Sequence, residues 1–141
     1  MSKRISVLLA CTVVLGATAA LAAHPMVVVD ENATKRDEPP PHGKIGMSTV
    51  WGITDAVPGR TMEFRKRALH KGAAIGPHKI AHDEVYYVVS GKGVVTSDGA
   101  SRTVTAGMAA YLYDGDTVGI SQEGDEPLTL IISYPRPTPA P

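Results

Sequence analysis

Residues 72–91 read GAAIGPHKIAHDEVYYVVSG, and this segment places a histidine and a glutamate beside a strand. A glycine stands at each end, and His78 lies six residues before Glu84. The β-branched and aromatic run after the glutamate, residues 85–89, favours a strand. Residues 90–93, Ser-Gly-Lys-Gly, are typical of a tight turn. The segment therefore predicts two strands around a bend, with both side chains placed to meet inside the fold.

Outward from this segment, the chain alternates short strand-forming runs with turns. The turns are marked by sequences such as Val57-Pro58-Gly59, Ser97-Asp98-Gly99 and Asp114-Gly115-Asp116. Besides the two strands around the bend, strands are predicted over residues 45–53, 61–69, 93–96, 102–104, 109–113, 117–122 and 128–134. No segment has a helical period over 12 or more residues. This spacing predicts an all-β sandwich or barrel, and the small, regular turns favour a double-sheet jelly roll.

The ends of the chain depart from this pattern. Residues 1–23 join a positive start, an apolar run and small residues, which predicts a signal peptide rather than a membrane anchor. The protein is therefore expected to be exported, to the periplasm or beyond, without a membrane span after cleavage. Residues 24–44 are interpreted as an arm, with a short strand at 26–29 and a Pro-rich linker from residue 31. Residues 135–141 are a Pro-rich tail, which leaves 45–134 as the barrel.

Composition argues against several function classes. The 14 basic and 14 acidic residues give a formal net charge of zero, so nothing indicates a nucleic-acid partner. The only cysteine, Cys11, lies in the predicted signal peptide. No disulfide, thiolate ligand or cysteine nucleophile is therefore expected in the exported chain.

The spacing within residues 72–91 resembles the first motif of the cupin family. That motif runs glycine, five residues, His-x-His, three or four residues, glutamate, six residues and glycine. Gly72, His78, Glu84 and Gly91 fit every interval, and Ile80 stands where the second histidine belongs.

A second cupin motif is present in a weaker form. It runs glycine, five residues, Pro-x-Gly, two residues, histidine, three residues and asparagine. The corresponding residues are Gly107, Tyr113, Gly115, Val118 and Gln122, of which three differ from the motif. The resemblance covers residues 45–134 and implies a single cupin-type jelly-roll β-barrel. It also implies a homodimer, since cupins commonly pair through sheet edges and the N-terminal arm offers one.

The resemblance bears on metal binding. Cupins that bind a divalent metal use the histidines and glutamate of the first motif and the histidine of the second. Here Ile80 and Val118 replace two of these ligands, and neither side chain donates a lone pair. A metal-free cavity is therefore favoured. The alternative is one divalent metal (Fe, Mn, Ni, Cu or Zn) held by His78, His82 and Glu84, which share one face if the strand is uninterrupted. Otherwise, His82 is a polar loop residue at the barrel mouth or a substrate contact.

Metal-free chemistry remains open to such a barrel. Related metal-free cupins use a histidine as general base and a tyrosine as general acid. His78 is the candidate base, and Glu84 is placed to orient it or to tune its charge. Tyr86 is the first candidate acid because it alternates onto the strand face of Glu84; the others are Tyr111 and Tyr113. For each tyrosine, the alternative is simple packing in the barrel.

Ligand contacts are also predicted from the sequence. Arg65 and Arg67 share one face of the strand before the first motif, where they either bind an anionic group inside the barrel or lie on a solvated outer face. Gln122 either contacts ligand or satisfies backbone groups. The predicted ligand-binding residues are Arg65, Tyr111 and Gln122.

Three functions follow from these alternatives. The first is a barrel that binds a small polar ligand, sugar-like or a carboxylate, without metal and with lyase or isomerase activity through acid–base catalysis. The second is a metal-dependent dioxygenase or isomerase using His78, His82 and Glu84. The third is a binding or structural module without catalysis. The sequence does not choose a substrate, because one fold hosts many activities.

Overall fold

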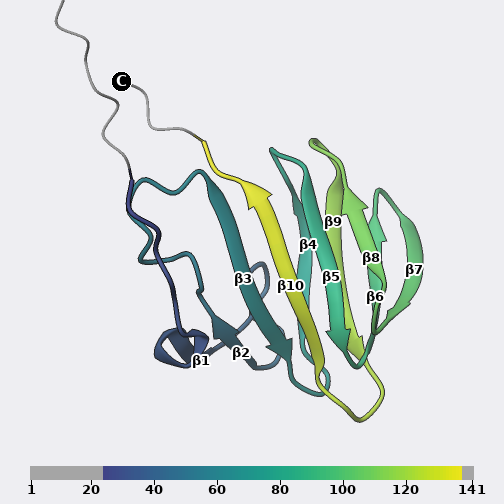
Figure 1. Ribbon diagram of the computed structural model, residues 1–141. Helices are drawn as coiled ribbons and strands as arrows, with labels where there is room; N and C mark the ends of the chain where they lie inside the picture. The colour runs from purple at the N-terminus through teal and green to yellow at the C-terminus, as the bar shows by residue number, and fades with distance from the viewer. Residues whose placement is uncertain (1–23, 138–141) are drawn as a thin grey trace, which may run out of the picture.

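Two antiparallel sheets face each other in the computed structural model, which describes residues 24–137 (Figure 1). The larger sheet has the order β1 (Lys35–Glu38), β2 (Ser48–Trp51), β3 (Met62–Leu69), β10 (Leu128–Pro135), β5 (Glu84–Ser90) and β8 (Ala109–Leu112). The smaller sheet has the order β4 (Ala74–Lys79), β9 (Thr117–Glu123), β6 (Lys92–Ser97) and β7 (Ala100–Thr105). A 3-10 turn, η1 (Glu31–Thr34), precedes β1. The predicted signal peptide, residues 1–23, lies outside the described residues, as do residues 138–141.

The core lies between the two sheets and follows from the alternation of side chains along the strands. Leu130 and Ile132 of β10 are buried, and they pack with Val88 of β5 and with Val118 and Ile120 of β9. Burying these side chains supplies the main driving force for closing the sandwich. The predicted all-β jelly roll is confirmed. No helix within residues 24–137 is long and apolar enough to cross a membrane.

The predicted strands around the bend and the predicted hairpin are both present. Strands β4 and β5 occupy the two halves of residues 72–91. Strands β6 and β7 pair around Asp98 and Gly99, whose φ angles of 44° and 81° are those of a turn that needs left-handed residues. Such turns match the twist of the strands they join.

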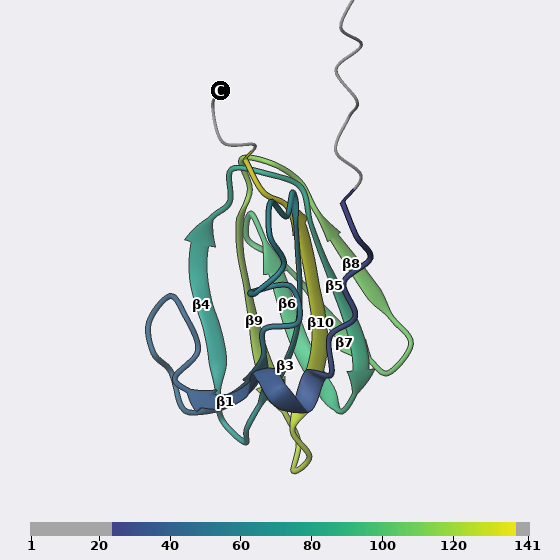
Figure 2. The same cartoon turned by 60° about the vertical axis from the view of Figure 1, so that its left-hand side comes forward.

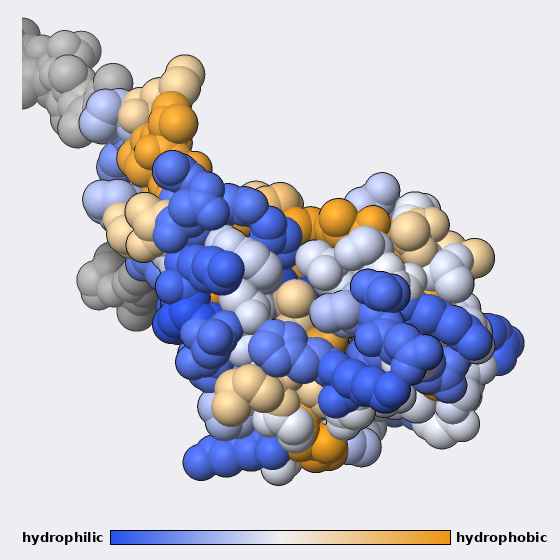
Figure 3. All heavy atoms as spheres, turned by 90° about the horizontal axis from the view of Figure 1, so that it is seen from below, coloured by the Kyte–Doolittle hydropathy of each residue, from blue (hydrophilic) through white to orange (hydrophobic). Residues whose placement is uncertain are grey.

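Two predictions for the N-terminal arm were wrong. Residues 26–29 form no strand, and the side chains of Met26 and Val28 are 90% and 85% exposed. Figure 3 shows hydrophobic surface beside the start of the described chain. The predicted linker instead contains η1 and β1, and β1 pairs with β2 at the edge of the larger sheet. The residues of β1, Lys-Arg-Asp-Glu, are all charged and have a low strand propensity, so the sequence did not predict this strand. Charged residues of this kind are tolerated in a strand at the exposed edge of a sheet.

The loop after β1 crosses from the larger sheet to β4 (Figure 2). It turns through three successive residues with positive φ, which are His42, Gly43 and Lys44. The backbone of His42 approaches β4 so closely that a Cβ added to Gly76 would lie 1.9 Å from the His42 carbonyl oxygen. A glycine at this position lets the loop lie against β4 and form one wall of the cavity described below.

Candidate functional site

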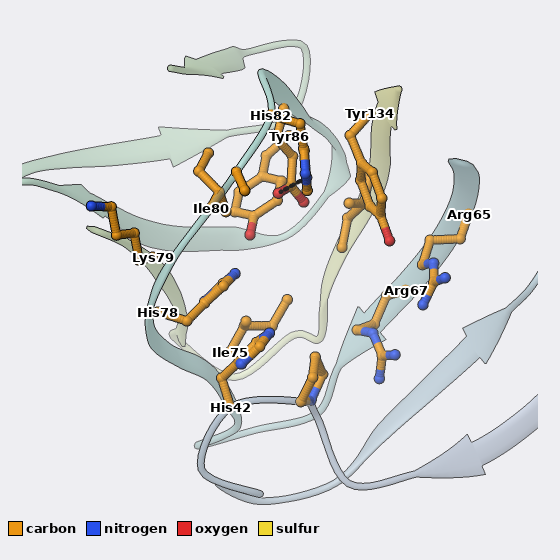
Figure 4. A pocket seen from close by; sticks show the side chains of 14 residues that line it. His42, Arg65, Arg67, Ile75, His78, Lys79, Ile80, His82, Tyr86 and Tyr134 are labelled. Atoms are coloured by element: carbon orange, nitrogen blue, oxygen red, sulfur yellow. Dashed lines mark ion pairs between the residues drawn. The ribbon is translucent and has the colours of Figure 1, made fainter. Parts of the chain in front are cut away.

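A cavity of about 330 Å³ opens between the sheets at one end of the sandwich (Figure 4). Its volume is at the lower end of the range for small-molecule sites. Residues of β3, β4, β5 and β10 line it, together with the β1–β2 and β4–β5 loops. The lining residues with ionisable or hydroxyl side chains are His42, Arg65, Arg67, His78, Lys79, His82, Glu84, Tyr86 and Tyr134.

A buried carboxyl group lies on one wall beside an imidazole. Glu84, the first residue of β5, is 6% exposed, and its Oε2 lies 3.4 Å from Nε2 of His82. The His82 ring stacks on Tyr134 with their centroids 4.3 Å apart. Burial raises the pKa of Glu84 to about 7, although the charge of Arg65 opposes this rise. The carboxyl group therefore exchanges protons near neutral pH, as an acid–base catalyst must.

This raised pKa predicts how stability depends on pH. A carboxyl group with a folded pKa of about 7 and an ordinary value of 4.5 binds its proton more tightly in the folded state. Its contribution is fully present below pH 4.5 and is lost as pH rises through 7. At about 1.4 kcal/mol for each pKa unit, the loss is about 3–4 kcal/mol. Between about pH 5 and about pH 8, urea denaturation should show a larger loss of unfolding free energy for the wild type than for Glu84→Gln. Equal losses would contradict the raised pKa.

Two arginines of β3 form a cationic wall. Arg67 is 2% exposed, and its terminal nitrogens donate to Ser48 Oγ at 2.5 Å and to Glu38 Oε1 at 2.8 Å. Arg65 donates from Nε and from a terminal nitrogen to Glu63 Oε1, at 2.9 and 2.6 Å. Of the two predicted placements for these arginines, the structure has the one inside the barrel. An anionic group of a ligand is what this wall would attract.

Two buried nitrogen atoms of the cavity lack a hydrogen-bond partner. They are Nε of Arg67 and Nε2 of His82, and they are the only such buried side-chain nitrogen or oxygen atoms within the described residues. The 3.4 Å approach of His82 to Glu84 does not have hydrogen-bond geometry. An unpaired buried polar group costs roughly 1–3 kcal/mol, so each such group requires an explanation. Both atoms belong to residues that line one cavity, so a small shift of either side chain would bring its nitrogen within reach of a ligand or water there.

His78 lies on the wall of the cavity that β4 forms. The sequence predicted a contact between His78 and Glu84, and the structure does not have it. Its ring stacks on His42 with centroids 3.6 Å apart, and its Nδ1 is 3.0 Å from the Gly76 carbonyl oxygen. Burial and the neighbouring His78 lower the pKa of His42. The carboxyl group of Glu84 instead has His82 as its neighbour. The reason is that the loop after β4 turns His82 back towards the start of β5.

Of the predicted tyrosine and glutamine contacts, only Tyr86 lies on the cavity. Tyr86 lines the cavity, and burial raises its pKa far above the usual range, so its hydroxyl group stays protonated. Tyr111 is 54% exposed and donates to Asp83, and Tyr113 packs beside it. Gln122 accepts from the Gly72 N–H and donates to three carbonyl oxygens nearby. Of the two predicted uses of Gln122, the structure shows the satisfaction of backbone groups.

Comparison with known proteins identifies the family. The family model of the cupin domain matches residues 66–134, which include the cavity residues of β4, β5 and β10. This chain is a cupin. A curated relative, the dimethylsulfoniopropionate lyase DddW of Ruegeria pomeroyi, is 32% identical over 95 residues, which are 67% of this chain and 61% of the relative. The matched part thus spans about three fifths of that relative.

Solved structures of other proteins share the fold of this cupin. A predicted oxalate decarboxylase from Thermotoga maritima has a TM-score of 0.69 and 22% identity, over 79% of this chain and all of that one. KdgF from a Halomonas species has a TM-score of 0.55 and 22% identity, over 64% of this chain and 78% of that one. At these identities the likeness concerns the fold alone.

The side chains at the metal-ligand positions of the cupin motifs do not fit a divalent metal. Ile80 and Val118 occupy two ligand positions and are 3% and 0% exposed, so apolar groups fill the places where donors would lie. Residues 24–137 contain no group of three His, Cys, Asp or Glu side chains arranged to hold a metal ion. The alternative set of His78, His82 and Glu84 is therefore not assembled, and only its last two members meet.

Three of the cavity residues with ionisable or hydroxyl side chains were not predicted from the sequence: His42, Lys79 and Tyr134. Tyr134 shares the inward face of β10 with Leu130 and Ile132, so the alternation along this strand was a usable signal. His42 comes from the Pro-rich segment, and no periodic pattern could have placed it against β4.

Proposed function

We propose that this cupin binds a small carboxylate in its cavity and moves a proton on it, as a lyase or isomerase does. The observation that carries the proposal is the pairing of two features on the larger sheet, on β5 and β3, the two strands that flank β10. One is the Glu84 carboxyl group, with a pKa of about 7 beside His82, and the other is the cationic wall of Arg65 and Arg67. A cavity with a few convergent polar groups and a perturbed carboxyl group is a candidate active site.

The arginine wall is the proposed binding end. The free Nε–H of Arg67 donates to a carboxylate oxygen, and Arg65 adds a second positive charge on the same face of β3. Charge-assisted hydrogen bonds of this type are about twice as strong as neutral ones. Ile75, Ile80 and Ile132 also line the cavity and give it apolar surface for a short carbon chain.

Glu84 is the proposed proton-transfer group. As the carboxylate, it takes a proton from the carbon next to the bound carboxylate, and His82 and the Tyr86 hydroxyl group lie on the same cavity. In a lyase reaction, the electrons of the broken C–H bond form a carbon–carbon double bond. The leaving group on the next carbon then departs with its bonding pair. In an isomerase reaction, the proton returns to a different face or atom.

The curated relative favours the lyase form of this proposal. Its name describes a lyase that acts on dimethylsulfoniopropionate, a three-carbon carboxylate with a sulfonium group. That activity belongs to the relative, and the incomplete overlap leaves it a proposal for this chain.

A panel of 3-substituted carboxylates tests the proposed function. The protein is incubated with dimethylsulfoniopropionate, malate and 3-hydroxybutyrate in deuterated water, and NMR follows both unsaturated products and deuterium at the CH2 carbon next to a carboxylate. We expect elimination, or exchange at this CH2 carbon, with at least one of them, and the loss of that reaction in Glu84→Gln. Saturable binding of carboxylates without either reaction would support a binding module instead. Binding of neutral sugars alone would refute the carboxylate site.

The metal content of the purified protein should be well below one ion per chain, because two ligand positions are apolar. Elemental mass spectrometry of protein prepared without chelator measures this. Near-stoichiometric iron, manganese, nickel, copper or zinc that disappears in His82→Ala would contradict the expectation. That result would instead support a metal-dependent enzyme that uses His78, His82 and Glu84.

We also propose that the protein is exported and forms a homodimer. The composition of residues 1–23 supports export, and the exposed apolar arm around Met26 and Val28 supports association with a second copy. N-terminal sequencing of the exported form and light scattering test these two proposals.

A further inference from the structure

An incomplete ring of ion pairs connects the two cavity arginines through the outside of the barrel. The contacts, in order, are Arg67–Glu38 (2.8 Å), Glu38–Arg36 (3.1 Å), Arg36–Asp55 (3.3 Å), Asp55–Arg60 (3.1 Å), Arg60–Glu63 (3.5 Å) and Glu63–Arg65 (2.6 Å). Charges alternate along the whole series, which begins and ends with an arginine that lines the cavity.

The ring is open only at the cavity. Arg65 and Arg67 stand two residues apart on the inward face of β3, and no carboxylate of the described residues bridges them. Arg136 adds a further pair with Glu63 at 3.1 Å. Five arginines of this network thus share three carboxylates, which is an excess of two positive charges while Glu84 is protonated. The exposed links add little stability individually, but the buried Arg67 and Glu63 fix where the positive charge lies.

The unpaired nitrogen atoms indicate that the ligand has two polar ends. Nε of Arg67 is on β3, and Nε2 of His82 is on the β4–β5 loop, although the whole His82 side chain is 26% exposed. Figure 4 shows Arg67 and His82 apart from each other, with Tyr134 between them. A single carboxylate at the arginine wall leaves the imidazole without a partner.

We infer that the ligand is a small organic dianion, most simply a dicarboxylate, with one carboxylate between Arg65 and Arg67 and the other at His82. This inference rests on the proposed function and narrows its substrate class. The first carboxylate supplies the anion missing from the ring. The second balances the remaining charge and partners His82, beside a Glu84 carboxyl group that donates a hydrogen bond when protonated.

The charge balance also disfavours zwitterionic carboxylates. A cation attached to the carbon chain would enter a cavity that already has an excess of positive charge, and like charges in a partly buried site repel strongly. This cupin should therefore bind a dicarboxylate more tightly than dimethylsulfoniopropionate.

Calorimetric titration with matched pairs of acids tests the inference. The protein is titrated with malonate against propionate, succinate against butyrate, and dimethylsulfoniopropionate, at constant ionic strength because screening weakens charge contacts. We expect the best dicarboxylate to bind at least tenfold more tightly than its monocarboxylate partner. We expect His82→Phe, which keeps a ring to stack on Tyr134, to reduce this ratio to below threefold. Circular dichroism confirms that the variant is folded.

The outcomes separate the inference from the proposed function. Equal affinity for both members of each pair overturns the dianion and leaves the carboxylate site standing. An unchanged ratio in His82→Phe overturns the placement of the second carboxylate. If no carboxylate binds, both proposals are overturned, whether or not a neutral sugar binds.

Discussion

Replacement of Arg67 by methionine is expected to weaken malonate binding by about 10- to 100-fold, because the cavity loses a charge-assisted donor worth roughly 1.5–3 kcal/mol. The arginine is 2% exposed, and its terminal nitrogens are held by Ser48 and Glu38. Its Nε is buried and has no hydrogen-bond partner. Methionine fills a similar volume without a charge, so the loss should appear in binding more than in folding. Calorimetry and thermal denaturation measure the two effects separately.

Arg36→Met is the matched control for this substitution. Arg36 belongs to the same ring of ion pairs, but it is 46% exposed and does not line the cavity. Exposed pairs contribute roughly 0–1 kcal/mol, so malonate affinity should change by less than about threefold. If Arg67→Met bound malonate as tightly as the wild type, the arginine wall would not be the binding end.

Glu84→Gln is expected to lower turnover by about 10²- to 10⁴-fold for whichever 3-substituted carboxylate the protein converts, since general acid–base catalysis contributes that much. The amide keeps the shape of the side chain but neither accepts nor releases the proton. Malonate affinity at about pH 6 should be retained, because the carboxyl group is largely neutral there. The kcat of the wild type should rise as pH increases through 7 or above, because the base acts when ionised.

His78→Gln provides the comparison for Glu84→Gln. His78 lines the same cavity and is the base that the sequence predicts, but its ring stacks on His42 away from the carboxyl group. We expect a smaller loss of turnover than for Glu84→Gln. A larger loss in His78→Gln would make His78 the base and would return Glu84 to a supporting role.

The fold was predictable from the sequence because its signals are local. Glycine-bounded runs of alternating residues mark nearly every strand of the barrel, and the Ser97-Asp98-Gly99 turn identifies one hairpin. The alternation along β3 also predicted which side chains share the face of Arg65. Strand β1 was missed because its stability comes from pairing with β2 and from ion pairs of Arg36 and Glu38, which are not local signals.

The site was predictable only in part because it depends on contacts between distant segments. The alternation along one strand predicts that Glu84 and Tyr86 share a face. The contact of Glu84 with His82 depends on the conformation of the loop after β4, which the sequence does not reveal. His42 reaches the cavity only because Gly76 lets a distant loop approach β4. The raised pKa of Glu84 is likewise a property of burial between two sheets, which no spacing within one motif reveals.

The protonation of Glu84 is the most direct test of the account. NMR of protein labelled at the glutamate carboxyl carbon, with Glu84→Gln to assign the signal, gives the pKa of this group in the folded state. We expect a value of about 7, because the carboxyl group is buried beside His82 on the cavity. Titration at the ordinary value of 4.5 would contradict it, because the cavity would then hold no group poised to exchange a proton at neutral pH.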